Sequence, residues 1–524
     1  MDKITGRKSS KRHPRVVVVG AGPGGLAAAA LLARAGAKVT VVERDAVVGG
    51  RTRTWATAEG YRFDAGPTFF LYPRVLREIF AACGARLEDH VELRRLEAAY
   101  RLVFEDGDEL TVSGDLAGME RAIAALSPHD AANVRRFLDD NRTKLGLFRP
   151  VLEQDFSRLR DLVTPAMIRA LPWLRPRLSV DSDLRKYFED ARVRLAFSFQ
   201  TKYLGMSPFK CPSLFTILSF LEYEHGVYHP IGGCGTVSVA TAQLVRELGA
   251  EIRLSAPAER IEFANGRPRV VLAGGQRHTA DAVVINGDFA HAAPRLIPQE
   301  YRPRWSDTKL SKSRLSCSTF MLYLGIVGSL RPLPHHTVLL ARDYRRNLQD
   351  IEQGNLPLEP SLYVQHAGAT DDGMAPPGHT SLYVLVPVPN LRAGIDWRRE
   401  ASRYRDLVLA RLKLVGIKDL EHRIRYERVV TPLEWRDEFA IGEGATFSLA
   451  HNIGQMLYWR PHNRFGPGIY LTGGGTHPGS GLPTIYESAR ISARLLLQDF
   501  GLDAQVAMPP REIVLAAGDR EVAA

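Results

Sequence analysis

The chain has 524 residues, of which 45% are hydrophobic and 24% are charged. This composition excludes a disordered protein, and the length predicts two domains with at least one large core. The formal net charge of +11 at pH 7 predicts an anionic partner. An acidic membrane surface is favoured over nucleic acid, because the basic residues are spread along the chain and no short nucleic-acid-binding motif is present.

The first apolar run, residues 16–33, follows a basic N-terminus as in a signal peptide. Glycines and a proline near its centre favour a strand, a turn and a helix instead. No other stretch reaches the about 18 apolar residues that a spanning helix needs, so any membrane contact is predicted to be peripheral. The cysteines lie far apart, which predicts neither a metal site nor a disulfide framework and suits a cytoplasmic protein. They are Cys83, Cys211, Cys234 and Cys317.

A nucleotide-binding motif follows the first predicted strand, Val16 to Val19. Gly20-Ala21-Gly22-Pro23-Gly24-Gly25 reads G-x-G-x-x-G and leads into a predicted helix. Gly20 permits the tight turn, Gly22 the approach of the pyrophosphate, and Gly25 the close packing of the helix on the strand. The helix N-terminus then offers unpaired N–H groups to the phosphates.

A second predicted strand, Lys38 to Val42, ends in Glu43. An acid at this distance accepts hydrogen bonds from the ribose hydroxyls and argues against a 2′-phosphate. The segment Val48 to Arg53 comes next, and its Gly-Gly-Arg resembles an extension typical of flavin amine oxidases. The glycines let the chain pass close to a cofactor, and Arg51 can neutralise a pyrophosphate, so the segment favours FAD over NAD.

The C-terminal region carries a second glycine-rich passage from strand to helix. The predicted strand Ile469 to Thr472 runs into GGGTHPGSGLPT, and a helical pattern follows from Ile485 to about Phe500. We expect this segment to fold back onto the N-terminal domain. A helix that begins at Pro483 or Thr484 would direct its positive end at an isoalloxazine ring.

The passage GGGTHPGSGLPTIYESAR resembles the C-terminal motif of the bacterial phytoene desaturase and carotenoid oxidoreductase family. Further similarities run in order along the chain, in FDAGPTFF, GVYHPIGGCGTV, ADAVVINGD, CSTFMLYLGI, MAPPGHTSLYVLVPVPN and YWRPHNR. The resemblance implies an FAD-dependent desaturase that introduces double bonds into a carotenoid precursor of the phytoene or diapophytoene type. It also implies an α/β fold of the flavin amine oxidase superfamily, with a Rossmann-type, glutathione-reductase-like FAD domain and a discontinuous α+β substrate domain.

The resemblance further implies that FAD is bound noncovalently. The residues expected to contact it are Gly20, Gly22, Gly25, Glu43, Arg44, Gly50, Arg51, Gly66, Pro67, Thr68, Ala258, Gly475, Thr476, His477, Gly481, Leu482, Pro483 and Thr484. The stretch Glu251 to Ile261 is similar to the segment that lies against the adenine. Many flavoproteins carry an acid after the last glycines, where this chain has Thr476, and its relatives share that choice.

The chain order of these motifs predicts discontinuous domains. The FAD-binding domain consists of residues 1–75, 226–295 and 466–524. Residues 76–225 form a mostly helical insertion that contacts substrate and membrane, and residues 296–465 form a mixed substrate domain.

Two stretches of the helical insertion are candidates for docking to a membrane surface. Met167 to Tyr187 mixes basic and aromatic residues, and Cys211 to Leu221 is apolar but too short to span a bilayer. An ordinary core helix is the competing interpretation of each.

A hydrocarbon substrate needs an apolar tunnel beside the flavin, which accepts the hydride. The second hydrogen leaves as a proton and requires a group that accepts it. Asp139 and Arg142 lie three residues apart on a predicted helix and are the candidate pair, because the family carries a similar acid and arginine here. A surface ion pair is the competing interpretation.

Other functions fit the same scaffold. Carotenoid isomerases, ketolases or oxygenases, and squalene-type desaturases share it. Rab GDP-dissociation inhibitors carry prenyl groups on a similar fold without flavin, but the complete glycine motif and Glu43 weigh against that class. An amine or porphyrinogen oxidase would place polar residues over the flavin rather than an apolar tunnel.

Overall fold

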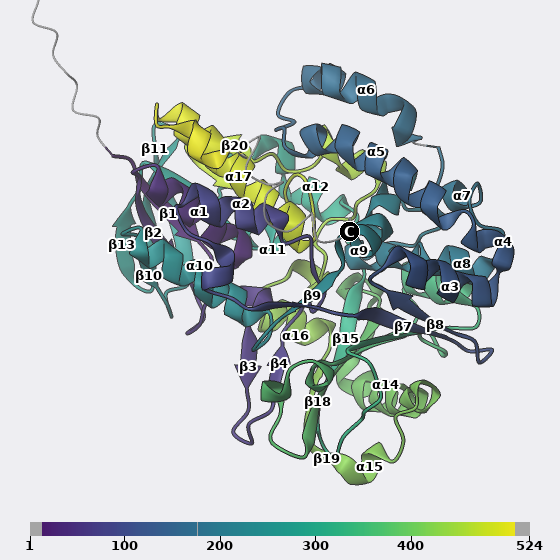
Figure 1. The fold of residues 1–524 in the computed structure, drawn as a ribbon. Helices are drawn as coiled ribbons and strands as arrows, with labels where there is room; N and C mark the ends of the chain where they lie inside the picture. Colours follow the sequence, from purple (N-terminus) through teal and green to yellow (C-terminus); the bar gives the residue numbers. More distant parts are fainter. Residues whose placement is uncertain (1–12, 176, 509–524) are drawn as a thin grey trace, which may run out of the picture.

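A computed structural model describes residues 13–175 and 177–508 (Figure 1). The first and last stretches of the predicted FAD-binding pieces, residues 1–12 and 509–524, lie outside the described residues.

The first sheet has six strands in the order β10-β2-β1-β14-β21-β20. The strands from β10 to β21 run parallel, and β20 is antiparallel at the edge. They are β1 (Arg15–Val19), β2 (Lys38–Val42), β10 (Glu251–Arg253), β14 (Ala282–Ile285), β20 (Arg464–Gly466) and β21 (Ile469–Leu471). Three distant stretches of the chain therefore meet in one sheet.

Helices cover one face of this sheet and a smaller sheet covers the other. Helix α1 (Pro23–Arg34) packs against α10 (Gly235–Glu247) and α17 (Leu482–Asp499). Its fully buried alanines, Ala27 to Ala30, let these helices approach closely. On the opposite face lie α11 (Phe289–Leu296) and an antiparallel sheet. That sheet consists of β11 (Ala258–Ala264), β12 (Arg267–Ala273) and β13 (Gln276–Thr279).

The second large sheet has seven strands in the order β19-β15-β18-β17-β16-β7-β8. They are β7 (Ala98–Phe104), β8 (Glu109–Ser113), β15 (Ser318–Val327), β16 (His336–Leu340), β17 (Leu362–His366), β18 (His379–Val388) and β19 (Ile424–Val430). Helix α14 (Trp397–Leu412) packs on one face through a core that includes Leu324, Val364 and Val384.

The region predicted to be mostly helical, residues 76–225, also contributes strands. It supplies β7 and β8 to the second sheet, and β7 pairs in parallel with β16, more than two hundred residues later in the chain. The pattern of apolar residues within a short window does not indicate a pairing partner so far along the chain. These strands were therefore not predicted from the sequence.

Apart from α2 (Arg74–Ala82), which packs against α1 and α17 beside the first sheet, the helices of this region lie over the end of the second sheet, on the right of Figure 1. They are α3 (Leu116–Leu126), α4 (Pro128–Ala131), α5 (Val134–Leu152), α6 (Pro165–Leu174), α7 (Val180–Leu184), α8 (Ala191–Ala196) and α9 (Ile217–His225). Two small sheets join the parts, with β3 (Thr54–Ala56) and β4 (Arg62–Asp64) in one and β5 (Phe70–Leu71), β6 (Leu93–Arg95) and β9 (Val227–Pro230) in the other. The remaining helices are α12 (Asp307–Lys312), α13 (Tyr344–Gln353), α15 (Leu420–Arg423) and α16 (Pro432–Asp437).

Candidate functional site

The turn after β1 gathers Gly20, Gly22 and Gly25 around Asn286. A Cβ at Gly25 would lie 2.1 Å from the carbonyl oxygen of Gly20, so only glycine fits. The Asn286 side-chain amide, just after β14, donates to the Gly20 carbonyl at 3.3 Å. A Cβ at Gly22 would come within 3.0 Å of the same amide nitrogen. Sequence reasoning missed Asn286, although its position directly after a buried strand was a usable signal.

Glu43 ends β2 and is buried. Its carboxylate accepts hydrogen bonds from the backbone N–H groups of Ala21 at 2.6 Å and Asp45 at 3.0 Å. Burial raises the pKa of Glu43, and these bonds oppose the shift. The Ala256 N–H donates to the Glu43 carbonyl at 2.7 Å, which places Ala258 and the start of β11 nearby. Glu43 therefore braces the glycine turn, and its contact with a ribose stays a prediction.

The Gly-Gly-Arg segment lies directly on the glycine turn. The Gly49 N–H donates to the carbonyl of residue 21 at 2.8 Å. Gly49 and Gly50 have φ angles of 105° and 51°, a left-handed conformation that favours glycine. The Arg51 guanidinium donates to the Thr446 carbonyl at 2.5 Å. Burial lowers the pKa of Arg51, and the nearby Asp288 carboxylate opposes that shift.

Gly66 lets the next predicted segment approach closely. A Cβ at this position would lie 2.7 Å from the Arg51 carbonyl oxygen. Pro67 follows and is exposed, so the surface beside this segment is open. Arg44, by contrast, donates to the Glu438 carbonyl. The contact of Arg51 with the pyrophosphate and that of Arg44 with the cofactor stay predictions.

The N-terminal and C-terminal glycine segments lie against each other. A Cβ at Gly24 would lie 3.1 Å from both the Thr472 hydroxyl oxygen and the Ile485 side chain. Gly473 has a φ of 105°, and a Cβ there would lie 3.3 Å from the Asn286 amide oxygen. The C-terminal segment therefore folds back onto the first glycine turn, as the sequence predicts.

Helix α17 starts beside this junction. Gly481, with φ 109°, precedes the helix, and Leu482, Pro483 and Thr484 form its first turn. The Thr484 hydroxyl donates to the Ser480 carbonyl at 2.8 Å. The predicted helix start thus lies within a few residues of the observed one.

A fully buried arginine supports the C-terminal loop. Arg460 donates to the carbonyls of Gly474 at 2.6 Å and Thr476 at 3.1 Å. Burial lowers the pKa of this guanidinium to about 9. Asn463 donates to the His477 carbonyl at 3.1 Å. Sequence analysis noticed YWRPHNR only as a similarity and assigned no role to these side chains.

The other predicted residues of this loop are buried. A Cβ at Gly475 would lie 2.7 Å from the Cβ of Phe289. The Thr476 hydroxyl donates to the Pro461 carbonyl at 2.7 Å. His477 packs edge-on against Phe156, and burial lowers its pKa to about 3, so the imidazole is neutral at physiological pH.

Tyrosines of the second sheet hold the segment from Ala65 to Thr68. Tyr323 donates to the Ala65 carbonyl at 2.7 Å and Tyr383 to the Gly66 carbonyl at 2.8 Å. The Tyr363 and Thr68 hydroxyls are 2.6 Å apart. Sequence reasoning did not find these tyrosines, because their partners lie some 250 residues or more away.

The geometry fits a bound dinucleotide. Glycine is required at Gly25, where a Cβ would collide with the Gly20 carbonyl of the same turn, and at Gly66, where it would collide with the Arg51 carbonyl. Without side chains, these segments can approach a ligand with backbone atoms. The buried Thr472 hydroxyl, close to Gly24, has no hydrogen-bond partner among the described residues. A polar ligand would satisfy such a group.

The candidate catalytic pair lies elsewhere, on the outer side of α5. Arg142 donates to Asp139 at 2.6 Å and to both carboxylate oxygens of Glu224 at 2.9 Å. The Asp139 and Arg142 side chains are 62% and 52% exposed. This geometry is typical of a surface ion pair, and a catalytic role stays a prediction.

The chain matches known proteins over most of its length. The model of the flavin-containing amine oxidoreductases matches residues 23–497. A 4,4'-diapophytoene desaturase (4,4'-diapolycopene-forming) of Methylomonas sp is 43% identical over 92% of this chain and 95% of its own. An all-trans-zeta-carotene desaturase of Myxococcus xanthus is 42% identical over 94% of both chains. A double mutant of putrescine oxidase shares the fold, with a TM-score of 0.62 at 17% identity over 93% of this chain and 99% of its own.

The chain therefore belongs to the flavin-containing amine oxidoreductases and, among them, to the carotenoid desaturase family. The predicted α/β fold of this superfamily is confirmed. A flavin is the cofactor class of the family.

Proposed function

We propose that this protein is an FAD-dependent desaturase of a carotenoid precursor of the phytoene or diapophytoene type. The observation that carries the proposal is the contact between the two glycine segments, in a chain 43% identical to a diapophytoene desaturase. FAD supplies the hydride acceptor when bound.

The chain's own residues bind and orient this cofactor. The turn at Gly20, Gly22 and Gly25 and the start of α1 would receive the pyrophosphate. Glu43 would accept bonds from a ribose, and Arg44 and Arg51 add positive charge nearby. Ala258 would lie against the adenine end. The loop from Gly475 to Thr484 and the start of α17 would face the isoalloxazine, where the helix dipole favours negative charge.

The predicted domain division fits the same proposal. Residues 1–75, 226–295 and 466–524 would form the FAD-binding domain, because the first sheet draws its strands from these pieces, apart from β20. Residues 76–225 and 296–465 would form the substrate domain, since strands from both share the second sheet.

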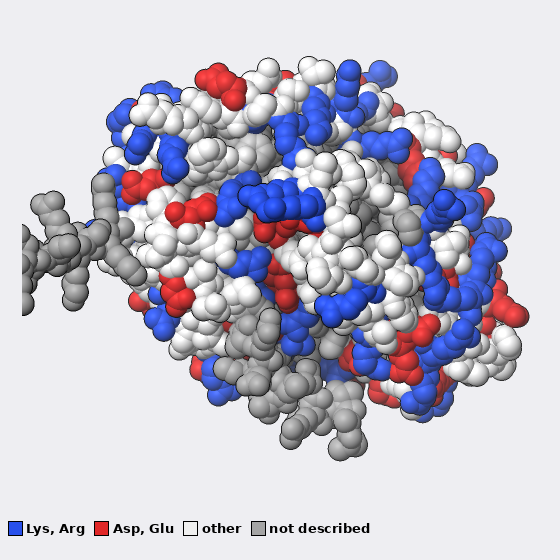
Figure 2. Space-filling model, turned by 90° about the horizontal axis from the view of Figure 1, so that it is seen from above, with Lys and Arg blue, Asp and Glu red and all other residues white. Residues whose placement is uncertain are grey.

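A membrane surface is the proposed source of the water-insoluble substrate. In and around α6, Val163, Ile168 and Leu171 are 67%, 58% and 59% exposed, beside the exposed Arg169 and Arg175. Such a mixture suits a lipid headgroup layer. Figure 2 looks down on the face that carries α6 in Figure 1 and shows Lys and Arg bordering uncoloured surface.

The second docking candidate, Cys211 to Leu221, is mostly buried, so its apolar residues belong to the core. Among the helices of residues 13–175 and 177–508, none combines the length and apolarity needed to cross a bilayer.

Docking is tested with an Ile168→Glu, Leu171→Glu double variant and anionic liposomes. We expect cosedimentation to fall by about tenfold or more, because two apolar contacts are replaced by charges that anionic lipids repel. Leu358→Glu is the matched control, since Leu358 is 73% exposed but far along the chain. Equal binding of the double variant and the control would overturn docking through α6.

The enzymatic proposal is tested by feeding purified protein with phytoene, diapophytoene and squalene in liposomes. We expect a yellow protein that releases FAD on denaturation and converts one of the C30 or C40 polyenes into products with longer chromophores, read by absorbance and mass. A product with unchanged mass would indicate an isomerase, and added oxygen a ketolase. A colourless protein that takes up no flavin would favour the prenyl-carrier class instead.

A further inference from the structure

A polar row crosses the second sheet on the face opposite α14. The strand register pairs Tyr323 with Tyr383, Tyr383 with Gln365, and Gln365 with His336. Because side chains alternate between the two faces of a sheet, these residues share one face, and so does Tyr363, two positions before Gln365. Polar groups in such a row are unusual in a protein interior and call for a function.

The Tyr363 hydroxyl connects the predicted flavin segment to the first histidine of this row. It lies 2.6 Å from the Thr68 hydroxyl and 2.7 Å from Nδ1 of His336. Phe69 stacks on the His336 ring at a centroid distance of 4.1 Å. His336 is fully buried, whereas Tyr363 is only half-buried. Tyr363 is therefore the most exposed residue of the row, and its hydroxyl borders Thr68.

Two more histidines extend the row away from the flavin segment. The ring centroids of His336 and His335 are 4.4 Å apart, and those of His335 and His229 are 4.6 Å apart. Nε2 of His336 and Nδ1 of His229 are buried without a hydrogen-bond partner among the described residues. Between them, Nε2 of His335 lies 3.2 Å from the Gln365 side-chain nitrogen. A proton would pass from one imidazole to the next when that contact opens, directly or through one water molecule.

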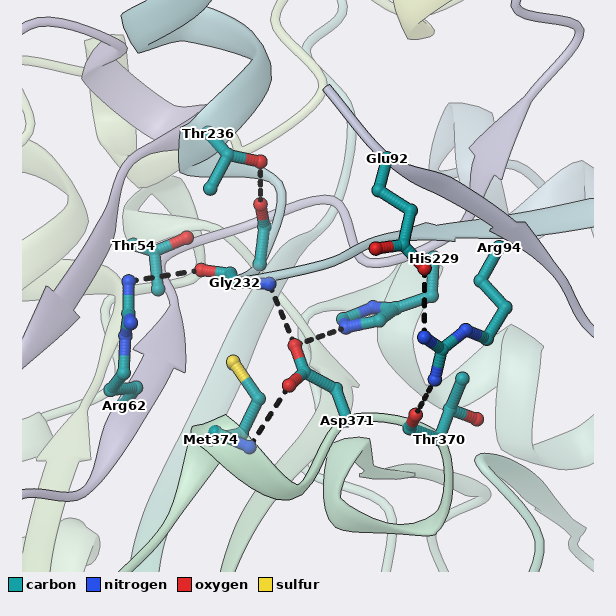
Figure 3. Close-up of polar contacts among 12 residues, drawn as sticks. Thr54, Arg62, Glu92, Arg94, His229, Gly232, Thr236, Thr370, Asp371 and Met374 are labelled. Atoms are coloured by element: carbon teal, nitrogen blue, oxygen red, sulfur yellow. Dashed lines mark hydrogen bonds and ion pairs between the residues drawn. The ribbon is translucent and has the colours of Figure 1, made fainter. Parts of the chain in front are cut away.

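The row ends near the surface. Nδ1 of His335 lies 2.9 Å from the Thr370 hydroxyl, and the Thr370 carbonyl accepts from the exposed side of Arg94. The Asp371 carboxylate lies 3.2 Å from Nε2 of His229 and accepts from the Gly232 N–H at 2.7 Å. Figure 3 shows the Asp371 carboxylate joined to both His229 and Gly232, and Arg94 joined to Thr370.

The electrostatics suit passage of a proton rather than its storage. Burial lowers the pKa of His335 and of His336 well below the usual value, and neighbouring histidines add to the shift. Burial raises the pKa of Asp371, but bonds from His229 and backbone N–H groups outweigh it and lower this pKa to about 2. The negative charge of Asp371 thus lies at the end of the row away from Tyr363. The other titratable groups facing the row are His366, Asp64 and Cys234.

We propose that Tyr363, His336, His335 and His229 form a route by which the proton released from the polyene leaves the site toward Thr370 and Asp371. The proposal rests on the proposed desaturase function. Desaturation removes one hydrogen with its electron pair, for which bound FAD would supply the acceptor, and the neighbouring hydrogen as a proton, whose C–H electrons form the new double bond. The Tyr363 oxygen takes this proton as its own hydroxyl proton passes to Nδ1 of His336.

The test compares Tyr363→Phe with Tyr61→Phe. Tyr363→Phe removes the hydroxyl that begins the proposed route and keeps the aromatic ring. Tyr61→Phe removes an equivalent hydroxyl, which lies 2.6 Å from Nδ1 of His379 at another place in the same region. In anaerobic mixing with diapophytoene in phosphatidylcholine liposomes, we expect Tyr363→Phe to slow flavin reduction by about tenfold or more. Its solvent deuterium isotope effect should change, and that of Tyr61→Phe should match the unmodified protein.

A second readout needs no flavin and no turnover. In protein labelled with 15N-histidine and freed of flavin, the His336 Nδ1 resonance should shift in Tyr363→Phe and stay in place in Tyr61→Phe. An active unmodified protein with unchanged reduction rate and isotope effect in Tyr363→Phe would overturn the route alone. If none of the polyenes reduces the flavin of the unmodified protein, the desaturase function is overturned, and the route with it.

Discussion

The two large sheets present different kinds of atoms to the proposed flavin site. The first sheet presents backbone groups, because its strands end in glycine turns such as those at Gly20 and Gly473. The second sheet presents side-chain hydroxyls and imidazoles, such as Tyr383 and His336. Backbone groups in a glycine turn can hold a cofactor closely, because no side chain stands between them and the ligand. Such a turn does not tolerate substitution of its glycines. Side chains can be exchanged one by one by mutation, so the contribution of each group of the second sheet can be tested separately.

The largest effect is expected when a glycine that the close approach of the backbone requires is replaced. Gly25→Ala should abolish flavin binding and lower the free energy of unfolding by about 3 kcal/mol, because its Cβ would lie 2.1 Å from the Gly20 carbonyl oxygen. Flavin absorbance and thermal denaturation measure both effects. Gly146→Ala, inside α5 with nothing within 4 Å of its Cβ, is the control and should be neutral or slightly stabilising. Normal flavin content in Gly25→Ala would contradict this account of the turn.

The next largest effect is expected for the buried arginine that donates hydrogen bonds to the C-terminal glycine loop. Arg460→Met should cost about 2 kcal/mol and weaken flavin binding, because the carbonyls of Gly474 and Thr476 lose a buried donor. Arg464→Met in the same motif is the control, since Arg464 only pairs with Asp499 at the surface. Titration of FAD into flavin-free protein should separate the two variants. Equal affinities would mean that Arg460 does not hold the loop.

The same contrast explains what the sequence could predict. Gly20, Gly25 and the loop after Leu471 were identifiable because a turn that requires glycine leaves a local pattern. Asn286, Arg460 and Tyr383 were not identifiable, because each acts on a segment far away in the chain and looks like an ordinary polar residue of its strand or loop. The strands β7 and β8 were missed for a similar reason, since their sheet is completed by residues from the second half of the chain.

An effect of similar size on stability alone should appear in the helices that cover the second sheet. Burial raises the pKa of Glu222 to about 7 from 4.5, while bonds from Gln200, Tyr203 and Tyr100 oppose the shift. Between these pH values the folded protein holds more protons than the unfolded chain, so stability falls as pH rises and the full penalty applies above pH 7.

Glu222→Gln removes this titration. We expect the variant to gain about 2 kcal/mol relative to the unmodified protein between pH 5 and pH 8. Chemical denaturation at several pH values measures it. Glu224→Gln on the same helix is the control, because Glu224 is bound to Arg142 at the surface. Parallel pH profiles for Glu222→Gln and the unmodified protein would show that the carboxyl is ionised in the folded state.

The smallest effect is expected for the exposed pair on α5. Arg142→Ala should cost less than about 1 kcal/mol, because both ion pairs of Arg142 are solvated and screened. The rate of polyene desaturation should stay within about twofold of the unmodified rate, since among the described residues the Arg142 side chain bonds to Asp139 and Glu224 and not to the glycine turns or the polar row of the second sheet. A loss of about a hundredfold, the size expected of an acid or base, would instead return Asp139 and Arg142 to the active site. Such a result would require α5 to move toward the proposed flavin site when substrate binds.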